Sequence, residues 1–578
     1  MKIIFKGIVQ GVGFRPTIYR VATALGLKGY VLNKGSEVEV VIDSNVEKFI
    51  KNVKKNLPSI AQITDIVVLP DNRKFKDFKI IHSKDGKRQS LIPVDIGICN
   101  DCLNEISDRK NRRYSYPFTN CTVCGARYSL IKKVPYDRER TSMSDFKLCK
   151  KCTFDYTDPI NRRYHAQTIS CPICGPRFKL YDKNQNDLGE ENSIIGFSKH
   201  IDNGKIGVLK SWGGMHICCK FDGVNRFRQW YKRPQKSFAV MVRDIETAQE
   251  YAGITKEEQE LLLSKNKPIV LLEKKKAEEI SPGLNSIGIF LPYTGLHHIL
   301  FSHLENSALI MTSANLPGEP MMTQNEEVFS LGADYYLLHN RDIPNRVDDS
   351  VVKLWKNKTF FLRKSRGFVP DPLNVIYKDH ILSVGPDENI TGSISVDKKI
   401  FTTQYIGNSR YYNTLIFLEE SLRHLMNLMM EEPQLDAVVM DLHPAYDTRQ
   451  IAKKFSDEFS VPSFEVQHDH SHVASLLIDN EIDEIVALVV EGLGYGTDGT
   501  FWGGDVFYSN FKNFKRVGHL EYIPLLGGDQ ATLDPKRLVY AIFNKIGKEK
   551  YFHDNDAKIL SKLMHDSPLS CSKNMVTF

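Results

Sequence analysis

Eight of the eleven cysteines form four Cys-x-x-Cys pairs, a pattern that can bind metal ions. Eighteen residues separate the two pairs within each half of the pattern, and the second half follows the first after 50 residues. The eight residues are Cys99, Cys102, Cys121 and Cys124 in the first half, and Cys149, Cys152, Cys171 and Cys174 in the second. Two such turns at this separation supply four thiolates to a tetrahedral zinc ion. The spacing therefore predicts two structural Zn2+ sites whose closed shells leave no open position for a substrate.

The similarity between the two halves extends beyond the cysteines. Asn111-Arg112-Arg113-Tyr114 recurs as Asn161-Arg162-Arg163-Tyr164, which indicates an internal duplication of a small module. Four disulfides are the alternative, but they require an oxidising compartment, and the chain starts without an export signal. The other cysteines lack this spacing and are interpreted as buried or incidental thiols: Cys218, Cys219 and Cys571.

Basic residues accompany both modules and allow two interpretations. They could contact RNA or an acidic partner, or they could form the solvated face of a small metal-bound module, which we favour. These residues are Arg109, Lys110, Arg112, Arg113, Arg162 and Arg163.

A second group of residues with chemical potential lies between Gly7 and Pro16. The loop residues Gly11, Val12, Gly13 and Phe14 run into an expected helix. Two glycines in such a loop let backbone N–H groups converge on an anion, and the helix dipole favours its negative charge. Arg15 then offers a planar guanidinium fork for two phosphate oxygens.

The elements that position this loop follow an alternating order. We expect a strand at Ile3–Ile8, a helix starting near Pro16, a strand ending at Ile42 with one buried face, a helix at 46–57 and a last strand near 75–81. This βαββαβ order is the ferredoxin-like arrangement.

Composition places limits on the whole chain. At 578 residues it is too long for one core, and its 42% hydrophobic and 25% charged residues are ordinary for a soluble protein. The net charge of +7 comes from many lysines rather than one tract, which disfavours nucleic-acid binding. The apolar run after Met1 is too short for a signal peptide and no segment is long enough to span a membrane, so we expect a cytoplasmic protein.

Two further regions carry candidate ligands. No GxxxxGK[ST] loop occurs, so a nucleotide would be held by scattered Lys, Arg, Ser and Asn groups in the mixed α/β region. Further on, apolar runs at 437–440 and 485–490 are typical of buried parallel strands, and a glycine-rich loop follows at 491–500. His468 and His472 lie four residues apart before a helical stretch and can chelate a divalent metal.

Several of these motifs resemble known families. The string from Gly7 to Pro16 is similar to the signature of acylphosphatases, which implies that Arg15 binds an acyl phosphate and Asn33 orients the attacking water. A ferredoxin-like domain with an inactive loop is the alternative. The region 190–375 resembles the YrdC fold, whose members bind ATP and make an acyl adenylate. That resemblance implies nucleotide or carbamoyl contacts by Arg233, Lys236, Ser313, Asn315 and Arg346.

In this order the regions resemble the HypF family of hydrogenase-maturation carbamoyltransferases, most specifically at 135–138 and 163–167. The implied architecture is multidomain, α+β and α/β. It comprises a ferredoxin-like acylphosphatase domain (1–85), two four-cysteine zinc modules (92–180), a YrdC-like α/β domain (190–375) and the first lobe of an actin-like ATPase-type domain (380–578). The implied substrates are carbamoyl phosphate and ATP with Mg2+. The implied partner is a HypE-type protein that receives the carbamoyl group on a C-terminal cysteine, and no membrane is involved.

The sequence departs from the family pattern at several positions. Tyr231 replaces a lysine, and Ser237 follows Lys236 where proline is usual, so weaker ATP binding is expected. Other departures lie in the carboxy-terminal region: Asn389, Ile390, Tyr405, Asn408, Asp469, Ser471 and Glu491. With no second-lobe motif in the last tens of residues, a truncated or diverged member is expected, and transfer by this chain alone is doubtful.

Two alternatives belong to other functional classes. A tRNA threonylcarbamoyl-type enzyme would explain the YrdC-like part, but it has no need of an acylphosphatase loop. A zinc-dependent acylphosphatase or scaffold would retain the fold without transfer activity.

Overall fold

The computed structural model describes residues 1–35, 37–58, 60–82, 92–528, 530–552, 556–566 and 575–577, so Cys571 lies outside the described residues. The chain divides into two compact units, each described by itself below. The first comprises Met1–Pro372, Glu388–Val396 and Phe401–Gln434, and the second Leu373–Asp387, Asp397–Ile400 and Leu435–Phe578. None of the helices described here is long and apolar enough to cross a membrane.

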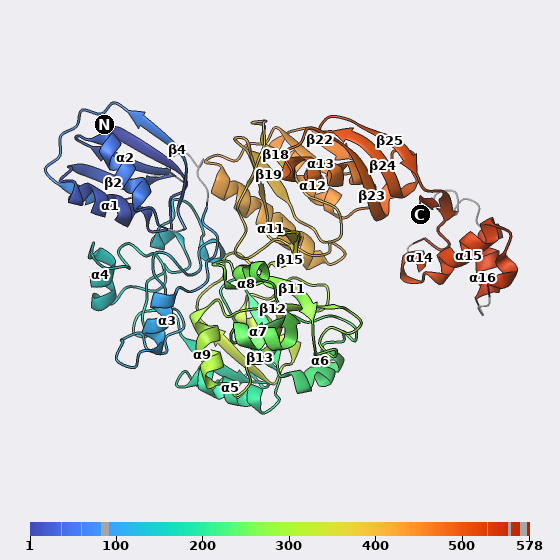
Figure 1. The fold of residues 1–578 in the computed structure, drawn as a ribbon, viewed down its shortest axis with the longest axis horizontal. Coiled ribbons are helices and arrows are strands. Elements are labelled where there is room, and N and C mark those ends of the chain that lie inside the picture. Colours follow the sequence, from blue (N-terminus) through green and yellow to red (C-terminus); the bar gives the residue numbers. More distant parts are fainter. Residues whose placement is uncertain are drawn as a thin grey trace. The chain divides into compact units, whose positions relative to one another are not determined.

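The amino-terminal part of the first unit is a five-stranded sheet with two helices (Figure 1). Its elements are β1 (Lys2–Ile8), α1 (Phe14–Ala24), β2 (Gly29–Lys34), β3 (Glu37–Ile42), α2 (Val46–Lys55), β4 (Gln62–Leu69) and β5 (Phe78–Ile80). The strand order is β4-β1-β3-β2-β5. Apolar residues of the sheet pack against Phe14 and Ile18 of α1 and Phe49 of α2, so the helix that follows the phosphate loop is fixed by the core.

Two expectations for this sheet were wrong. The strand that completes the βαββαβ order is β4, which pairs antiparallel with β1, whereas the expected strand near 75–81 is the short β5 beside β2. In β3 both faces are buried, not one. Glu39 tolerates burial because its carboxylate accepts a hydrogen bond from the Tyr30 hydroxyl at 2.7 Å and pairs with Lys2 Nζ at 3.0 Å.

The cysteine region has little regular structure. Its elements are α3 (Asn100–Ser107), α4 (Lys150–Thr157) and two 3₁₀ helices, η1 (Tyr128–Leu130) and η2 (Arg138–Arg140). Cys99 and Cys149 each cap the start of the helix that carries the second cysteine of its pair. The duplication therefore reproduces the same local fold twice.

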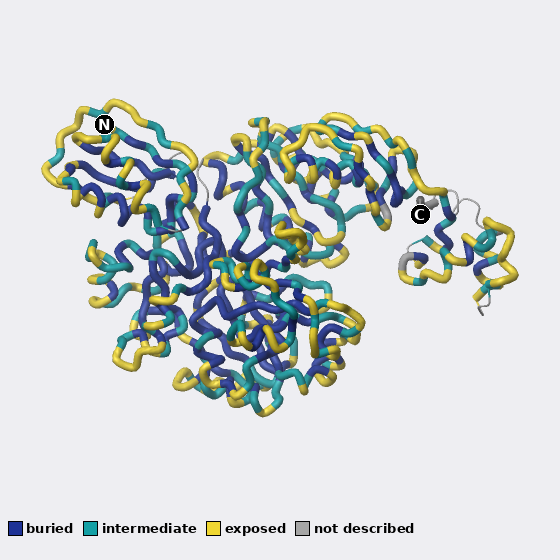
Figure 2. Tube along the Cα trace, in the orientation of Figure 1, coloured by how far each residue is buried: buried dark blue, intermediate teal, exposed yellow. Residues whose placement is uncertain are grey.

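The mixed α/β region forms one large sheet flanked by helices, and Figure 2 shows much of its interior as buried. The strand order is β16-β15-β11-β12-β9-β13-β8-β7-β14-β6, with β10 beside β11. The strands are β6 (Phe178–Asp182), β7 (Gly207–Lys210), β8 (Met215–Cys219), β9 (Val240–Val242), β10 (Ala252–Gly253), β11 (Ile269–Lys274), β12 (Ser286–Phe290), β13 (Ala308–Ser313), β14 (Tyr335–His339), β15 (Val351–Trp355) and β16 (Lys358–Arg363). Cys218 and Cys219 lie buried in β8, as expected for incidental thiols.

The remaining elements of the first unit are helices and one strand. They are α5 (Ser193–Asp202), η3 (Phe221–Gly223), α6 (Val224–Trp230), α7 (Ile245–Tyr251), α8 (Lys256–Leu263), α9 (Gly295–His303), α10 (Asn325–Val328), η4 (Phe329–Leu331), β19 (Ser393–Val396) and α11 (Tyr412–Met429). The α8 start has a capping box, in which Thr255 and Glu258 satisfy each other's backbone N–H groups.

The second unit contains parallel strands, as expected from the apolar run at 437–440. β18 (Ile381–Ser383) and β22 (Ser463–Val466) both pair parallel with β21 (Ala437–Asp441). Its helices here are α12 (Thr448–Phe459) and α13 (His468–Asp479), and β17 (Leu373–Asn374) pairs antiparallel with β20 (Lys399–Thr402).

The expectation of a buried parallel strand at 485–490 was wrong. β23 (Glu484–Tyr495) pairs antiparallel with β24 (Phe501–Asn510), and its ladder shifts register between Val490 and Gly494. Ala487 and Val489 pack in a core with Phe507, while Val490 on the other face is 82% exposed. A hairpin alternates its faces, so a continuous apolar run does not imply burial on both. The unit also contains β25 (Phe514–His519), β26 (Tyr522–Pro524), α14 (Gln530–Leu533), α15 (Lys536–Lys545), η5 (Glu549–Tyr551), α16 (Ala557–Asp566) and β27 (Met575–Thr577).

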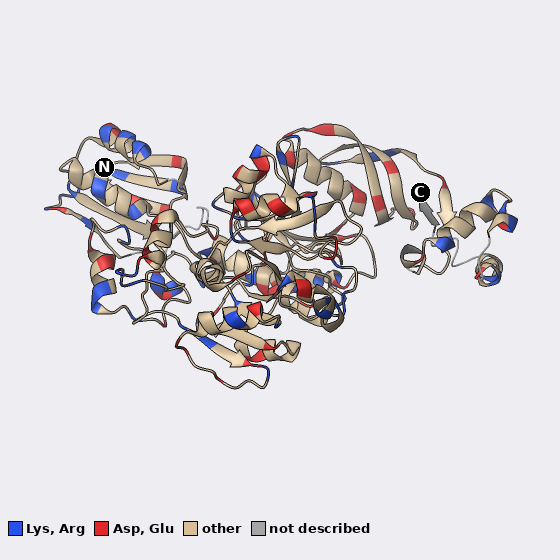
Figure 3. Cartoon of the chain, turned by 60° about the horizontal axis from the view of Figure 1, so that its bottom comes forward, with Lys and Arg blue, Asp and Glu red and all other residues tan. Residues whose placement is uncertain are grey.

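Charged residues are interspersed along most elements. Figure 3 shows lysine and arginine on helices and strands throughout the chain, with acidic residues between them. This distribution fits the expectation that the net charge comes from many separate lysines.

Candidate functional site

The phosphate-loop candidate lies between β1 and α1. Gly11 and Gly13 have φ values of 67° and 77°, a conformation that glycine adopts without steric cost. A Cβ atom on Gly11 would lie 2.9 Å from the Tyr136 ring, and one on Gly13 would lie 3.0 Å from Thr122 Oγ1. Both glycines are therefore required by the conformation and by the close approach of the cysteine region.

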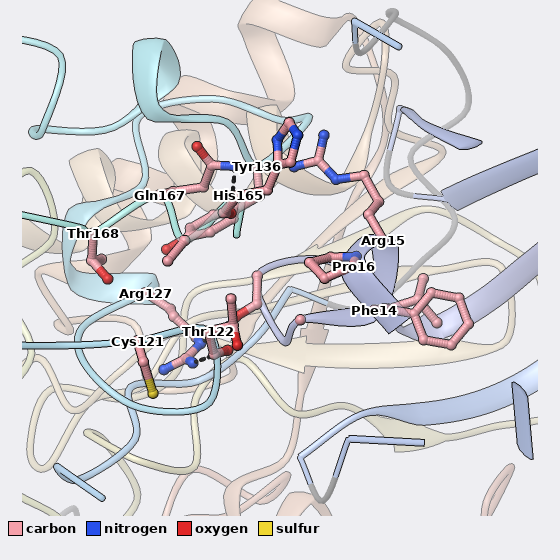
Figure 4. A pocket seen from close by; sticks show the side chains of 14 residues that line it. Phe14, Arg15, Pro16, Cys121, Thr122, Arg127, Tyr136, His165, Gln167 and Thr168 are labelled. Carbon is pink, nitrogen blue, oxygen red and sulfur yellow. Dashed lines mark hydrogen bonds between the residues drawn. The ribbon is translucent and has the colours of Figure 1, made fainter. Parts of the chain in front are cut away.

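A small pocket opens at this loop (Figure 4). One wall is the loop itself with Arg15, and the other comes from the cysteine region. The lining residues from the cysteine region are Cys121, Thr122, Arg127, Tyr136, His165, Ala166, Gln167 and Thr168. The pocket is thus built by two domains that are far apart in the sequence.

The two catalytic candidates of this domain differ in their surroundings. Arg15 is buried, lines the pocket and donates from Nη2 to Asp137 Oδ1 at 2.9 Å. Asn33 in β2 is fully buried, and neither polar atom of its amide has a hydrogen-bond partner among the described residues. Asn33 is not among the described residues that line the pocket. An unsatisfied buried amide is costly unless a water or ligand completes it, which fits a group that would hold a water.

The two cysteine clusters have the geometry of four-thiolate metal sites. In the first, Sγ–Sγ distances are 3.7 Å for Cys99–Cys121, 3.7 Å for Cys121–Cys124 and 3.6 Å for Cys102–Cys124. In the second, Cys171 Sγ lies 3.7 Å from Sγ of both Cys149 and Cys174. A tetrahedron with metal–sulfur bonds of about 2.3 Å has edges of about 3.8 Å. Both clusters therefore fit one metal ion each.

Two arginines of the second module contact the first cysteine cluster. Arg162 Nη2 lies 3.3 Å from Cys102 Sγ, and Arg163 Nη2 lies 3.8 Å from the same sulfur. Both guanidinium groups also pair with the Glu105 carboxylate. Arg163 is buried, and its Nε donates to the Asn120 carbonyl at 2.8 Å.

Two arginines of the first module contact the second cysteine cluster in the same way. Arg112 Nη1 lies 3.3 Å and Arg113 Nη2 lies 3.7 Å from Cys152 Sγ, and both pair with Asp155. Arg113 Nε donates to the Ser170 carbonyl at 3.0 Å. The four arginines therefore neither form a solvated face nor present an RNA-binding surface. They hold the modules together by compensating negative charge at each other's clusters.

The nucleotide candidates meet around Tyr231, which follows α6. Its hydroxyl donates to Asn315 Oδ1 at 2.9 Å, and the backbone carbonyl of Ser313 lies 3.3 Å away. The Arg233 guanidinium lies 5.2 Å and Lys236 Nζ 5.8 Å from the centre of its ring. The aromatic ring thus stands between two cations and the amide, at the position where a lysine was expected.

Lys236 and Arg346 are both desolvated. Burial lowers the pKa of Lys236 to about 8, and the positive charges of Arg233 and Arg363 act in the same direction. Clustered cations that repel one another are stabilised by an anion such as a phosphate. Arg346 is separate from the contacts around Tyr231: its guanidinium lies 4.4 Å from the centre of the Phe417 ring, and burial lowers its pKa.

A third group of candidates lies in the second unit, at the start of α13 and in the irregular part of β23. His468 Nε2 and His472 Nε2 are 3.2 Å apart, and Glu491 Oε2 lies 3.6 Å and 3.2 Å from them. Together these three residues could hold a metal ion. Two imidazoles and one carboxylate leave coordination positions open for other ligands.

Asp441, at the end of β21, orients this group. Its Oδ2 lies 2.8 Å from His468 Nδ1, which leaves Nε2 directed toward His472 and Glu491. Burial alone would lower the pKa of His468, but the carboxylates of Asp441 and Glu491 raise it to about 10. Asp469 instead is buried beside Gly494, where a Cβ atom would lie 2.5 Å from its Oδ1.

The sequence reasoning placed three residues of these sites in motifs but assigned no chemistry to them: Asp137, His165 and Asp441. Asp137 and His165 stand within 135–138 and 163–167, the two stretches most similar to the family, although no chemistry was assigned to them. Asp441 ends an apolar strand, which is a position where α/β proteins place ligands.

Comparisons with known proteins match every region of the chain. Family models match residues 1–80 (Acylphosphatase), 98–131 and 148–181 (HypF finger), 199–365 (described as Telomere recombination), 377–479 (HypF Kae1-like domain) and 487–573 (Carbamoyltransferase, Kae1-like Domain, second subdomain). The chain is 42% identical over 601 aligned residues to the probable carbamoyltransferase HypF of Methanocaldococcus jannaschii, covering 99% of this chain and 78% of that protein.

The chain belongs to the HypF family. It is also 38% identical to the carbamoyltransferase HypF of Synechocystis, over 93% of this chain and 72% of that protein. The full-length HypF in the phosphate- and nucleotide-bound form superposes with a TM-score of 0.92 at 34% identity, and T. kodakarensis HypF with 0.92 at 37%. These two structures cover 100% of this chain, which covers 77% and 78% of theirs.

The family assignment confirms the resemblance and the multidomain architecture drawn from the sequence. One detail differs, because residues 487–573 match the second subdomain of the HypF Kae1-like domain, whereas the sequence reasoning placed 491–500 in a first lobe. Glu491 therefore lies in the stretch that matches the second subdomain, while His468 and His472 lie in the stretch that matches the HypF Kae1-like domain model.

We predict that the Arg162→Ala/Arg163→Ala double variant weakens metal binding at the first cluster, although both residues belong to the second module. Removing groups that contact metal ligands typically lowers affinity about 10- to 100-fold. Metal content after zinc loading and mild chelation should fall from two ions per chain toward one.

The Arg109→Ala/Lys110→Ala variant is the control, because both side chains are exposed. The interpretation of Arg162 and Arg163 would be wrong if both double variants retained two ions with equal resistance to the chelator.

We also predict that Asp441→Asn weakens binding of a divalent metal by His468, His472 and Glu491 by about 10- to 100-fold, because the orienting carboxylate is lost. Calorimetric titration of the metal is the measurement. Asp479→Asn, at the exposed end of α13, should bind as the unaltered protein does. Equal affinities in both variants would show that Asp441 does not orient His468.

Proposed function

We propose that this HypF-family chain carries out carbamoyl transfer in three steps. Water first cleaves carbamoyl phosphate to carbamate and phosphate. Carbamate then attacks the α-phosphate of ATP, which gives carbamoyl adenylate and releases pyrophosphate. A thiol of an acceptor protein finally takes the carbamoyl group and AMP leaves. The acceptor we propose is the C-terminal cysteine of a HypE-type protein.

The observation that carries this proposal is the buried Arg15 at the glycine loop, in a chain that is 42% identical to a HypF protein over 99% of its length. Arg15 would bind the phosphate with the loop N–H groups. Asn33, with both polar atoms unsatisfied, would hold the attacking water. These roles use the two residues that the acylphosphatase resemblance singled out.

The adenylate step would use the residues around Tyr231. Arg233 and Lys236 would face the phosphates of ATP, which Mg2+ would accompany, while Asn315 and Ser313 would contact the nucleotide or the carbamoyl group. The chemical support is the desolvated Lys236 together with Arg233, both near the Tyr231 ring, whose hydroxyl contacts the Asn315 amide. Arg346 would contribute only at a distance from this group, since it packs on Phe417.

The two four-cysteine clusters would bind zinc, because four thiolates at tetrahedral spacing with no open position suit a structural Zn2+. The cysteine region would then act as a rigid connector. Toward the phosphate loop, Arg127 Nε of this region donates a hydrogen bond to the Gly11 carbonyl at 2.7 Å. Toward the α/β region, the Tyr128 carbonyl accepts a hydrogen bond from Asn345 Nδ2 at 2.6 Å. Carbamate decomposes quickly in water, so closely connected sites protect the intermediate.

The metal group of His468, His472 and Glu491 would hold a divalent ion in the transferase domain. Its open positions would be available to substrate oxygens, and a bound cation would polarise a carbonyl or phosphoryl group.

Tyr231 supports one second candidate, a zinc-bound acylphosphatase without adenylation, because a phosphate-facing lysine is replaced there. Labelled pyrophosphate distinguishes the two. Carbamoyl-dependent exchange of label into ATP supports the three-step reaction, and phosphate release without exchange supports the second candidate.

The basis for a tRNA-modifying enzyme is weakened, because the arginines of the modules face the cysteine clusters.

We predict that Arg15→Ala lowers phosphate release from carbamoyl phosphate at least 100-fold and leaves metal content unchanged, since Arg15 does not contact a cysteine cluster in any described contact. Initial rates of phosphate release are the measurement. The exposed Arg20 on the same helix provides the control, and Arg20→Ala should keep full activity. Activity in Arg15→Ala equal to that of the control would refute the site.

We predict that Lys236→Ala weakens ATP binding about tenfold, the usual loss for one charge-assisted contact. Because the pKa of Lys236 is about 8, its positive charge is lost as pH rises through that value. Affinity for ATP should therefore fall between pH 7 and pH 9 in the unaltered chain.

Lys236→Arg is the matched test, because arginine stays charged and should remove this pH dependence. Lys256→Ala, at the exposed start of α8, should bind ATP like the unaltered chain. A pH dependence that survives in Lys236→Arg would assign it to another group.

A further inference from the structure

Two segments of the cysteine region contribute to the wall opposite the phosphate loop. One contains Tyr136, which lines the pocket, and the other is the loop at 165–168 (Figure 4). Asp137, next to Tyr136, pairs with Arg15. Neither segment coordinates a metal, since the clusters are made by the eight cysteines alone. These segments therefore have contacts to the acyl-phosphate pocket that a purely structural zinc module does not require.

The duplication allows one of these segments to be compared with its own copy. His165 has φ 55° and Ser115, at the same place in the first module, has φ 53°. The backbone N–H of His165 donates to the Tyr156 carbonyl at 3.0 Å, and that of Ser115 to the Ile106 carbonyl at 2.8 Å. The turn is the same in both modules, so the fold itself does not require histidine.

The sequences of the two loops diverge from this point. The first module continues as Ser115-Tyr116-Pro117-Phe118 and the second as His165-Ala166-Gln167-Thr168. All four residues of the second version line the pocket that contains Arg15, and none of the first version does. The divergence therefore coincides with the contact to the acyl-phosphate pocket.

The surroundings of His165 hold its ring in place. The ring packs against Tyr156 at 4.8 Å and Tyr164 at 4.6 Å between centroids. Figure 4 shows it beside the Arg15 guanidinium. Burial lowers the pKa of His165 to about 3, and the charge on Arg15 acts in the same direction. A neutral imidazole offers one donor and one acceptor, which matches the carbonyl and amino groups of a carbamoyl unit.

Asp137 is fixed by the network around it. Next to it, the Tyr136 N–H donates to Gln10 Oε1 at 3.0 Å and the Arg138 N–H donates to Gln167 Oε1 at 2.9 Å. Its carboxylate accepts from Arg15 Nη2 at 2.9 Å. Because the five N–H donors of arginine form a fixed planar fork, this contact orients the whole Arg15 guanidinium.

We infer that the cysteine region supplies two residues of the acyl-phosphate site, with Asp137 positioning the Arg15 guanidinium for the phosphate and His165 binding the carbamoyl end of the substrate. This inference rests on the proposed hydrolysis of carbamoyl phosphate. Asp137 acts through Arg15 and so affects every acyl phosphate alike. His165 faces the acyl group and so distinguishes a carbamoyl from an acetyl group, which lacks the amino N–H donors.

The first test uses Asp137→Asn, which keeps size and removes the charge. We expect kcat/KM for phosphate release to fall about tenfold for carbamoyl phosphate and equally for acetyl phosphate. Affinity for inorganic phosphate, measured by calorimetry, should fall by the same factor. Unchanged or tighter phosphate binding would overturn the positioning role, since it would show that the carboxylate competes with phosphate for Arg15.

The second test replaces His165 with the residue of the first module. His165→Ser should lower kcat/KM for carbamoyl phosphate about tenfold, change that for acetyl phosphate little, and leave phosphate affinity and metal content unchanged. His165→Asn should restore part of the preference, because asparagine tolerates the left-handed backbone and keeps a donor and an acceptor.

Ser115→Asn, at the matching position of the first module, is the control and should behave as the unaltered chain. An equal loss for both substrates in His165→Ser, or no loss, would overturn the role of His165. If the unaltered chain released no phosphate from carbamoyl phosphate, the proposed function would fail. The phosphate titrations would still decide the role of Asp137: weaker binding in Asp137→Asn alone supports it, and equal binding in all variants refutes it.

Discussion

The structure of the first unit depends on charge compensation between the two cysteine modules. Four thiolates around a divalent metal carry a net charge of about −2, which is expensive to bury without compensation. Each cluster obtains its compensation from an arginine pair in the other module, through sulfur contacts of 3.3 Å to Cys102 and Cys152. Neither module can therefore bury its metal site without its copy.

This mutual arrangement explains how a region with little regular structure can connect two domains. The modules provide backbone and side-chain groups in both directions, toward the phosphate loop through Arg127 and toward the α/β sheet through the carbonyl of Tyr128. Because these contacts come from segments tied to the clusters, the pocket at Arg15 has a fixed second wall. A flexible linker of the same length would not provide one.

The sequence was informative where the chemistry is local. Cysteine pairs, a glycine loop before a helix and two histidines four residues apart are short patterns whose geometry follows from turns and helices. The contact between Arg15 and Asp137 joins residues 122 positions apart. No local sequence pattern can therefore predict it. Similarly, the apolar run of β23 does not reveal that its partner is the antiparallel β24, because pairing is decided by the following turn. The arginines were misjudged for the same reason: their partners lie in the other copy of the repeat.

The crossed arginine contacts also bear on how this chain can vary. In stacked repeat proteins the same interface recurs between each copy and its neighbour. Here Arg162 and Arg163 contact Cys102 of the other copy, and Arg112 and Arg113 contact Cys152 in the same way, so each arginine pair depends on a cluster outside its own copy. A change in one copy is therefore expected to affect the cluster of the other, whereas the loop that begins at Ser115 in one copy and His165 in the other lies outside these contacts and differs in sequence.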